Sequence, residues 1–205
     1  MDWHERLPLI AILRGITPAE ITEHTHALLE AGFQAIEVPL NSPEWARSIE
    51  TALAIGGDRA LVGAGTVLSV AHVDALNRLN ARLVVTPNTR PTVISHAVAC
   101  GMQVCAGCAT ATEAFEALDA GAQALKIFPS TCFGPDYIKA LKAVLPAQVP
   151  IFAVGGVTPQ NLSSYLQAGC LGAGLGSDLY RAGQSAETTF KHAQAFVSAY
   201  QETRQ

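Results

Sequence analysis

The chain has 205 residues, of which 49% are hydrophobic and 15% charged, and a formal net charge of −4 at pH 7. This length predicts one domain with a large core, and the charge offers no long-range attraction for nucleic acid or an anionic membrane. The opening stretch MDWHERLPLIAILRG is apolar only from Leu7 to Leu13, which predicts neither a membrane span nor a signal peptide. Five cysteines without regular spacing favour reduced thiols and a cytoplasmic location.

The chain repeats one pattern, in which a helix ends at a glycine and a short apolar strand follows. The stretches EAGFQAIEV (30–38), DAGAQALKI (119–127) and QAGCLGAGL (167–175) share it, and ACGMQVCAG (99–107) is a looser copy. Glycine is favoured there because the backbone after a helix often turns left-handed. Strands that are apolar on both faces are typical of a parallel sheet covered by helices.

Other strands and helices fill the intervals between these repeats. Thr17, Ser42 and Thr158 each precede a proline, so we expect them to cap the helices that follow. About eight βα units in a row predict a single-domain (β/α)₈ TIM barrel over residues 1–205, with a doubly wound open sheet as the alternative. The further strands are predicted at 7–13, 61–66, 83–87 and 150–156, and the helices at 18–31, 43–54, 70–80, 90–100, 110–120, 135–145, 159–168 and 184–201.

Lys126 is the only charged residue in the apolar run ALKIFP, which is typical of a buried strand. Lysine is rarely buried without a reason, because burial disfavours its charged form. One interpretation is a structural ion pair or a side chain that reaches the barrel rim. The other is a nucleophile whose lowered pKa leaves free amine near neutral pH, able to form a Schiff base with a carbonyl substrate.

Glu37 is the only acid in a second apolar strand, FQAIEVPL. Its carboxylate either neutralises Lys126 or moves protons to and from the intermediates of a Schiff-base reaction. The two roles are compatible, because an ion pair of the resting enzyme can become base and imine during turnover.

Glycines follow the last two predicted strands, in AVGGVTPQN (153–161) and GAGLGSDLY (172–180). Unpaired N–H groups before a helix attract an anion, and the loops after strands seven and eight of such barrels commonly bind phosphate. We therefore expect Gly155, Gly156, Gly176 and Ser177 to hold a phosphate group. The alternative is a pair of tight turns that need positive φ.

The sequence predicts no metal site and no cofactor. Cys105 and Cys108 form a CxxC pair without a second pair or a suitably spaced histidine, so we expect buried thiols. His24 and His26 lie two residues apart on a predicted helix and therefore point in different directions. No Rossmann fingerprint or P-loop is present.

Four stretches resemble the 2-keto-3-deoxy-6-phosphogluconate (KDPG/KHG) aldolase family, and the resemblance covers essentially the whole chain. GAQALKIFPSTCFG resembles the Schiff-base lysine motif and GFQAIEVPLNSP the acid motif, and VGAGTVL and AVGGVTPQN are similar too. The resemblance implies a class I aldolase, a lyase that needs no metal, assembled as a homotrimer. It implies that Lys126 forms the Schiff base and that Glu37 relays protons.

Further substrate contacts are expected at the ends of other strands. Arg14 is expected to hold the substrate carboxylate, since a guanidinium matches a carboxylate in two-point contact; the alternative is a salt bridge at the barrel rim. The resemblance adds the Thr66 hydroxyl to the same carboxylate. Phe128 and Pro87 are expected to wall the pyruvate end, with core packing as the alternative.

The acid motif departs from the family pattern at one place. Typical members read Glu-hydrophobic-Thr-Leu-Arg, whereas this chain reads EVPLN at 37–41. With LIAILRGIT at the start, the departure resembles the branch acting on 2-dehydro-3-deoxy-6-phosphogalactonate, the C4 epimer, in galactonate and galactose catabolism. Val154 stands where gluconate-type enzymes usually carry a threonine. The implied products are pyruvate and D-glyceraldehyde 3-phosphate.

Three alternatives remain at this point. One is a gluconate-specific aldolase of the same family, because one or two contacts decide the epimer. Another is a phosphosugar isomerase, epimerase or synthase, which shares the phosphate glycines without needing an imine-forming lysine. The third is a binding module that holds a phosphosugar without turning it over.

Overall fold

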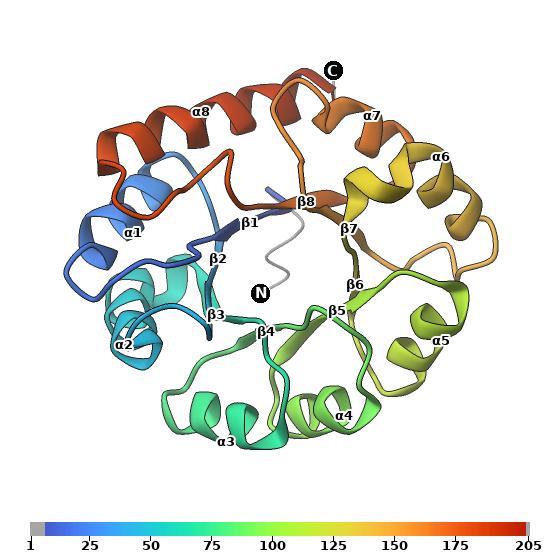
Figure 1. Ribbon diagram of the computed structural model, residues 1–205, viewed down its shortest axis with the longest axis horizontal. Helices are drawn as coiled ribbons and strands as arrows, with labels where there is room; N and C mark the ends of the chain where they lie inside the picture. The colour runs from blue at the N-terminus through green and yellow to red at the C-terminus, as the bar shows by residue number, and fades with distance from the viewer. Residues whose placement is uncertain (1–6, 204–205) are drawn as a thin grey trace.

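The computed structural model describes residues 7–203 and shows a closed barrel of eight parallel strands (Figure 1). Each strand pairs with the next, and β8 pairs with β1, so the predicted barrel is confirmed and the open sheet is excluded. Residues 1–6, the first part of the opening stretch, lie outside the described residues. The strands are β1 (Leu9–Ile12), β2 (Ala35–Pro39), β3 (Leu61–Gly65), β4 (Leu83–Val85), β5 (Gln103–Cys108), β6 (Ala124–Ile127), β7 (Ile151–Val154) and β8 (Gly172–Leu175).

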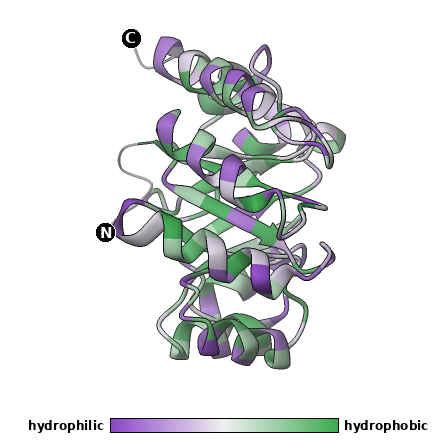
Figure 2. Cartoon of the chain, turned by 90° about the vertical axis from the view of Figure 1, so that its left-hand side faces the viewer, coloured by the Kyte–Doolittle hydropathy of each residue, from purple (hydrophilic) through white to green (hydrophobic). Residues whose placement is uncertain are grey.

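The described part of the chain contains eight α-helices, which form the outer ring around the strands (Figure 1). The helices carry both hydrophilic and hydrophobic residues, as Figure 2 shows, because one face packs on the barrel and the other meets water. Within the described residues, no helix is long and apolar enough to cross a membrane. The helices are α1 (Ile21–Glu30), α2 (Trp45–Gly56), α3 (Val70–Arg78), α4 (Pro91–Ala99), α5 (Ala111–Asp119), α6 (Ser130–Lys142), α7 (Leu162–Gln167) and α8 (Ala186–Thr203), with a short 3₁₀ turn at Gly57–Arg59.

The repeated glycine ends a helix, as the sequence pattern predicts. Gly121 has φ +95°, and its N–H donates to the carbonyl of Leu118 at 2.9 Å. The next N–H, of Ala122, donates to Ala117 at 3.0 Å, which completes a Schellman motif. The following strand β6 is fully buried, in agreement with a sheet covered on both faces.

Of the three hydroxyl residues predicted to cap helices, only Thr158 accepts a hydrogen bond from the N–H three positions along, that of Asn161, as a helix cap does. Each of the three begins a turn that precedes the helix, so α1, α2 and α7 start two or three residues later than expected. The Thr17 hydroxyl donates to the carboxylate three residues along, whereas Asn161 Oδ1 accepts from the N–H of Thr158 and completes a reciprocal pair. The Ser42 hydroxyl accepts from the N–H of Gly15 at 2.9 Å and joins two loops at the rim.

The helices next to the barrel mouth differ in part from the prediction. α6 begins at Ser130, and Gly134 interrupts it with φ 76° and ψ 170°, so the helix expected at 135–145 does start at Pro135 but follows a first segment that was not predicted. After β8 the chain forms a single turn, in which the N–H groups of Leu179 and Tyr180 both donate to Gly176. α8 begins only at residue 186. The peptide after β8 is therefore a substantial loop over the barrel mouth.

The inside of the barrel holds a small apolar cluster that is separate from the main core between strands and helices. Cys105 belongs to the inner cluster and Cys108 to the outer core, and burial raises the pKa of each thiol to about 12. The prediction of buried thiols is confirmed, and all five cysteines are free. The inner cluster consists of Ile10, Ile12, Ala35, Leu83, Val85, Cys105, Ala124, Phe152 and Val154.

Candidate active site

A cavity of about 590 Å³ opens at the C-terminal ends of the strands. All the predicted site residues line it except Glu37, which is buried behind the wall, and Pro87, which lies outside the lining. Its lining residues are Ile12, Arg14, Thr66, Lys126, Phe128, Val154, Gly155, Gly156, Val157, Gly176, Ser177, Asp178, Tyr180 and Arg181.

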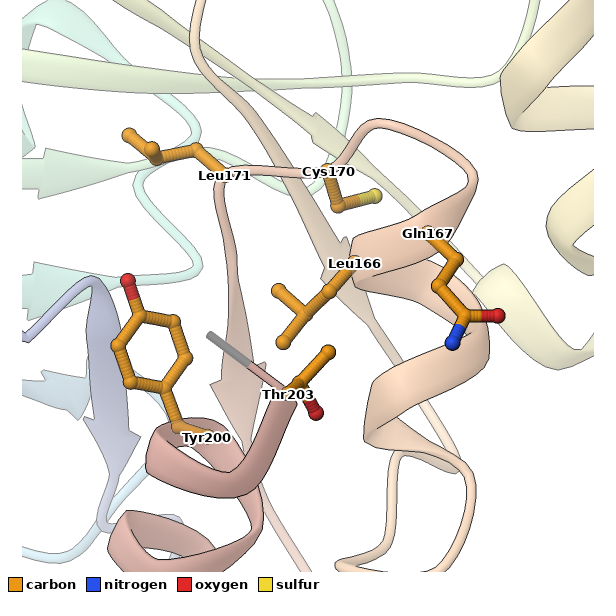
Figure 3. A pocket seen from close by; sticks show the side chains of 6 residues that line it. All are labelled: Leu166, Gln167, Cys170, Leu171, Tyr200 and Thr203. Atoms are coloured by element: carbon orange, nitrogen blue, oxygen red, sulfur yellow. The ribbon is translucent and has the colours of Figure 1, made fainter. Parts of the chain in front are cut away.

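A second cavity, of about 300 Å³, lies between α7 and α8 toward the N-terminal end of β8 (Figure 3). None of its lining residues is charged, and burial raises the pKa of its thiol, Cys170, to about 12. Of these two cavities, only the first is lined by charged side chains.

Lys126 projects from the middle of β6 into the first cavity, and its side chain is only 4% exposed. It makes no salt bridge or hydrogen bond with any described residue, so the predicted ion-pair alternative is not what the structure shows. The centroid of the Phe128 ring lies 5.0 Å from the Nζ atom of Lys126. Burial lowers the pKa of Lys126, and the Glu37 carboxylate partly opposes that shift. The side chain is thus a buried amine open to the cavity.

Glu37 projects inward from β2 and is 1% exposed. Its Oε2 atom has no hydrogen-bond partner among residues 7–203. Burial raises the pKa of Glu37 to about 7, against the opposing effects of the Lys126 and Arg14 charges. A carboxyl group with this pKa gains and loses a proton near neutral pH, as a general acid–base residue must.

Ser130 ties the lysine strand to its neighbour. Its hydroxyl donates to the carbonyl of Ile127 at 2.7 Å and accepts from the N–H of Val154 at 3.0 Å. The next residue, Thr131, donates its N–H to the carbonyl of Gly155 at 3.3 Å. The Phe-Pro-Ser stretch after Lys126 therefore fixes the ends of β6 and β7 relative to each other.

Arg14 lies at the end of β1, where its guanidinium donates to Asn41 Oδ1 at 2.8 Å. Asn41 is the residue at which the acid motif departs from the usual family arginine. The alternative role of Arg14, a salt bridge at the rim, is absent, since none of the salt bridges of the described residues includes it. A neutral partner leaves the full charge of Arg14 available to an anion at the cavity mouth.

Thr66 directly follows β3 and has φ 57°, a left-handed conformation that is unusual for a β-branched residue. Such backbone strain costs about 1–3 kcal/mol and is concentrated at functional sites. The conformation places Thr66 on the wall of the cavity that Arg14 also lines.

The opposite wall is built from the loops after β7 and β8. Gly155 and Gly156 have φ of +97° and +71°, so the predicted positive-φ turns are present at this wall. The sequence interpretation missed Arg181, which lines the same wall and whose Nε donates to the carbonyl of Ser177 at 2.9 Å. Arg181 lies in the loop before α8 and in no helix, so no helical spacing marked it; the only sequence signal was a cationic residue shortly after the glycines that end β8.

Asp178 and Tyr180 also line this wall and were not predicted. Among the described residues, no three His, Cys, Asp or Glu side chains gather in a way that could hold a metal ion.

The fold and the cavity together define a (β/α)₈ barrel with a buried lysine at the floor of its C-terminal mouth. A family profile described as KDPG and KHG aldolase matches residues 2–194. The chain is 63% identical to the 2-dehydro-3-deoxy-6-phosphogalactonate aldolase of Escherichia coli strain K12, over 100% of both chains. The chain belongs to the KDPG and KHG aldolase family, a family of lyases.

Solved structures agree with this assignment. One described as native KDPGal superposes with a TM-score of 0.97 at 63% identity, covering 100% of this chain and 99% of that one. A chain of a cube-shaped protein cage, designed by fusing symmetric oligomeric domains, is 64% identical with a TM-score of 0.96. That match covers 97% of this chain and 74% of the cage chain.

Proposed function

We propose that the protein is a class I aldolase that reversibly cleaves 2-dehydro-3-deoxy-6-phospho-D-galactonate to pyruvate and D-glyceraldehyde 3-phosphate. The observation that carries this proposal is Lys126, a buried amine without a salt bridge that faces the cavity from inside the barrel. The choice of substrate is supported by the 63% identity over full length to an enzyme named for the galactonate compound.

The reaction begins at Lys126. Its unprotonated Nζ attacks the C2 carbonyl of the substrate and forms a carbinolamine, which loses water to give an iminium ion. Burial supports this step, because the lowered pKa of Lys126 increases the fraction of free amine at neutral pH.

Glu37 then handles the proton. Its carboxylate accepts the proton of the C4 hydroxyl, directly or through a water molecule, while the C3–C4 bond breaks and its electron pair moves into the iminium. This releases D-glyceraldehyde 3-phosphate and leaves an enamine. Glu37 returns its proton to C3, and water hydrolyses the new iminium to release pyruvate and restore the amine. No electron acceptor besides the imine is needed.

The remaining residues hold the two charged ends of the substrate. Arg14 and the Thr66 hydroxyl bind the C1 carboxylate, with Phe128 as the wall of that end. At the other end, the 6-phosphate lies against the loops after β7 and β8, and Arg181 is added to the predicted set because it lines the same wall. We assign no substrate contact to Pro87, which lies outside the lining. The predicted phosphate-binding residues are Gly155, Gly156, Gly176 and Ser177.

Val154 contributes to the choice of epimer. Its side chain lines the cavity between the lysine strand and the phosphate loops. A valine offers no hydrogen bond to a C4 hydroxyl, which favours the galactonate over the gluconate configuration if the latter relies on a hydroxyl at this position.

We further propose a cytoplasmic homotrimer. The family resemblance supports the trimer, and so does the 64% identity to a chain of a cage built from symmetric oligomeric domains. Exposed apolar side chains such as Leu68, Phe115 and Phe133 suit burial between subunits. Light scattering coupled to size-exclusion chromatography measures the mass directly, and a monomer in solution contradicts the trimer.

The decisive experiment is borohydride reduction in the presence of pyruvate, followed by peptide mass mapping. We expect a reduced pyruvyl adduct on Lys126, no adduct in Lys126→Met, and an unchanged adduct in Lys139→Met, which removes an exposed lysine. No adduct in the native protein, or one on Lys139 or Lys142, contradicts the proposal and favours a phosphosugar isomerase or a binding module instead.

A further inference from the structure

One buried titratable residue takes no part in the proposed chemistry. His24 on α1 is 2% exposed, whereas His26 on the same helix is exposed, as the two-residue spacing predicts. α1 and α8 lie side by side in the outer ring (Figure 1). Nδ1 of His24 lies 2.8 Å from the hydroxyl oxygen of Thr189 on α8, which is fully buried. A histidine and a threonine thus share a hydrogen bond inside the helical layer.

Gln184 connects this pair to the loop after β8. Its Nε2 atom donates to the Thr189 hydroxyl at 2.7 Å and to the carbonyl of Leu179 at 2.9 Å. Its Oε1 atom accepts the backbone N–H of Arg181 at 3.0 Å. One amide side chain therefore holds the loop at two backbone positions.

The loop so held carries part of the phosphate wall. Ser177 and Arg181 both line the cavity, and Arg181 Nε donates to the Ser177 carbonyl at 2.9 Å. Tyr180 lies between them and the helical layer, with its ring 5.0 Å from the His24 ring in an edge-on arrangement of 84°. His24 on α1 is thus connected to residues that line the cavity, by hydrogen bonds through Thr189 and Gln184 and by ring contact with Tyr180.

The directions of these hydrogen bonds are consistent with a neutral imidazole. The amide nitrogen of Gln184 can only donate, so the Thr189 oxygen accepts from it and keeps its own proton for another partner. Nδ1 of His24 accepts that proton when the ring is neutral with its hydrogen on Nε2. Burial lowers the pKa of His24, which favours the neutral form, although the Glu20 charge, a hydrogen bond to the backbone of Gln184 and the Glu23 charge oppose the shift.

We propose that His24 is a positioning residue for phosphate recognition: through Thr189 and Gln184 it holds the loop 176–184 so that Ser177 and Arg181 face the phosphate group of the substrate. The inference rests on the proposed function. His24 is expected to affect binding of the phosphorylated end of the substrate and not the imine chemistry. Lys126 and Glu37 lie on β6 and β2, and none of the hydrogen bonds that join His24 to the loop includes either residue.

The test uses the full-length enzyme in the aldol-addition direction, with pyruvate and either D-glyceraldehyde 3-phosphate or unphosphorylated D-glyceraldehyde. In His24→Leu, kcat/KM for the phosphorylated aldehyde is expected to fall about 10-fold, mainly through KM, since one polar contact is lost. The value for the unphosphorylated aldehyde is expected to stay within about twofold. His26→Leu, on the exposed face of the same helix, is the matched control and leaves both values unchanged.

Two further variants separate positioning from general damage. Gln184→Ala acts on the loop itself, outside the helices, and is expected to show the same selective loss if His24→Leu does not fold. His24→Asn retains a polar group near the Nδ1 position and is expected to restore part of the phosphate preference. An equal loss with both aldehydes, or no loss with either in a folded variant, overturns the inference.

A binding measurement keeps this inference distinguishable from the proposed function. Titration calorimetry measures the affinity of glycerol 3-phosphate for the loops after β7 and β8 and needs no turnover. Weaker binding is expected in His24→Leu than in His26→Leu. If the native protein forms no pyruvyl adduct, the proposed function fails while this measurement still tests His24. If the adduct forms and glycerol 3-phosphate binds equally to both variants, the proposed function stands and the role of His24 is overturned.

Discussion

The Glu37 carboxylate lies in the space that a side chain on Gly65 would fill. A Cβ atom built on Gly65 would lie 1.3 Å from Glu37 Oε2 and 2.3 Å from its Cδ. The two residues are on neighbouring strands, β2 and β3. The missing side chain at Gly65 therefore makes room for the carboxyl group.

Gly65→Ala is expected to displace the Glu37 carboxyl group while leaving the strand intact, because the clash falls on the far end of a flexible side chain. Proton transfer by a positioned acid–base group contributes about 10²–10⁴-fold to a rate, so kcat for cleavage should fall by about 10²-fold or more. Trapping of pyruvate on Lys126 should still occur, since imine formation begins at the amine. Steady-state kinetics and borohydride trapping measure the two effects.

The control for Gly65→Ala is the same substitution in a Glu37→Gln background. If Gly65 acts through Glu37, the double variant should be little slower than Glu37→Gln alone, because the carboxylate is already absent. Equal losses from Gly65→Ala in both backgrounds contradict this relationship.

The Glu37 carboxyl group is expected to titrate near pH 7 and not near its usual value of about 4.3. Burial disfavours the carboxylate, so the group holds its proton as pH rises until about 7, and cleavage slows below that pH because the base is protonated. A ¹³C NMR titration with labelled glutamate, taken as the difference between native protein and Glu37→Gln, gives the midpoint.

Removing the Lys126 charge provides a second test, because that charge affects the pKa of Glu37. The Lys126 charge lowers the pKa of Glu37, so Lys126→Met should move the midpoint upward, while Lys139→Met leaves it unchanged. A midpoint near 4 in the native protein contradicts the burial argument.

Val154→Thr is expected to shift preference toward the gluconate epimer. A hydroxyl at this position supplies a hydrogen bond worth about 1–1.5 kcal/mol, so the ratio of kcat/KM values for the two epimers should change by about 10-fold. Val154→Ala is the control, because it changes volume without adding a hydroxyl and should not favour the gluconate. An unchanged ratio in Val154→Thr removes this residue from the specificity argument.

Ser130→Ala is expected to destabilise the barrel at the seam between β6 and β7. The N–H of Val154 loses its acceptor, and an unsatisfied buried donor costs about 1–3 kcal/mol. Urea unfolding measures the change in the free energy of unfolding. Ser95→Ala is the matched control: its exposed hydroxyl bonds to a carbonyl on its own helix, so a change within about 0.5 kcal/mol is expected. Equal changes in the two variants show that the Ser130 bridge adds no stability.

The amino-acid sequence by itself predicted the order of strands and helices, the burial of Lys126, and the position of the glycines that follow the last two strands. These features are local: an apolar strand, a glycine after a helix and a charge within an apolar run are each read from a few consecutive residues. The chemistry of Lys126 could be anticipated because a lone charge in such a run is costly.

The tertiary structure decided the relationships between residues that are distant along the chain. Closure of the sheet depends on the pairing of β8 with β1, and the space for Glu37 depends on a glycine on the neighbouring strand. The burial of His24 depends on Thr189, 165 residues away, and no local pattern distinguishes it from His26 beyond the face of the helix. The predicted cap at Ser42 is wrong for the same reason, because its hydroxyl accepts from Gly15 in another loop. Packing brings such partners together, and their identity is not contained in either segment alone.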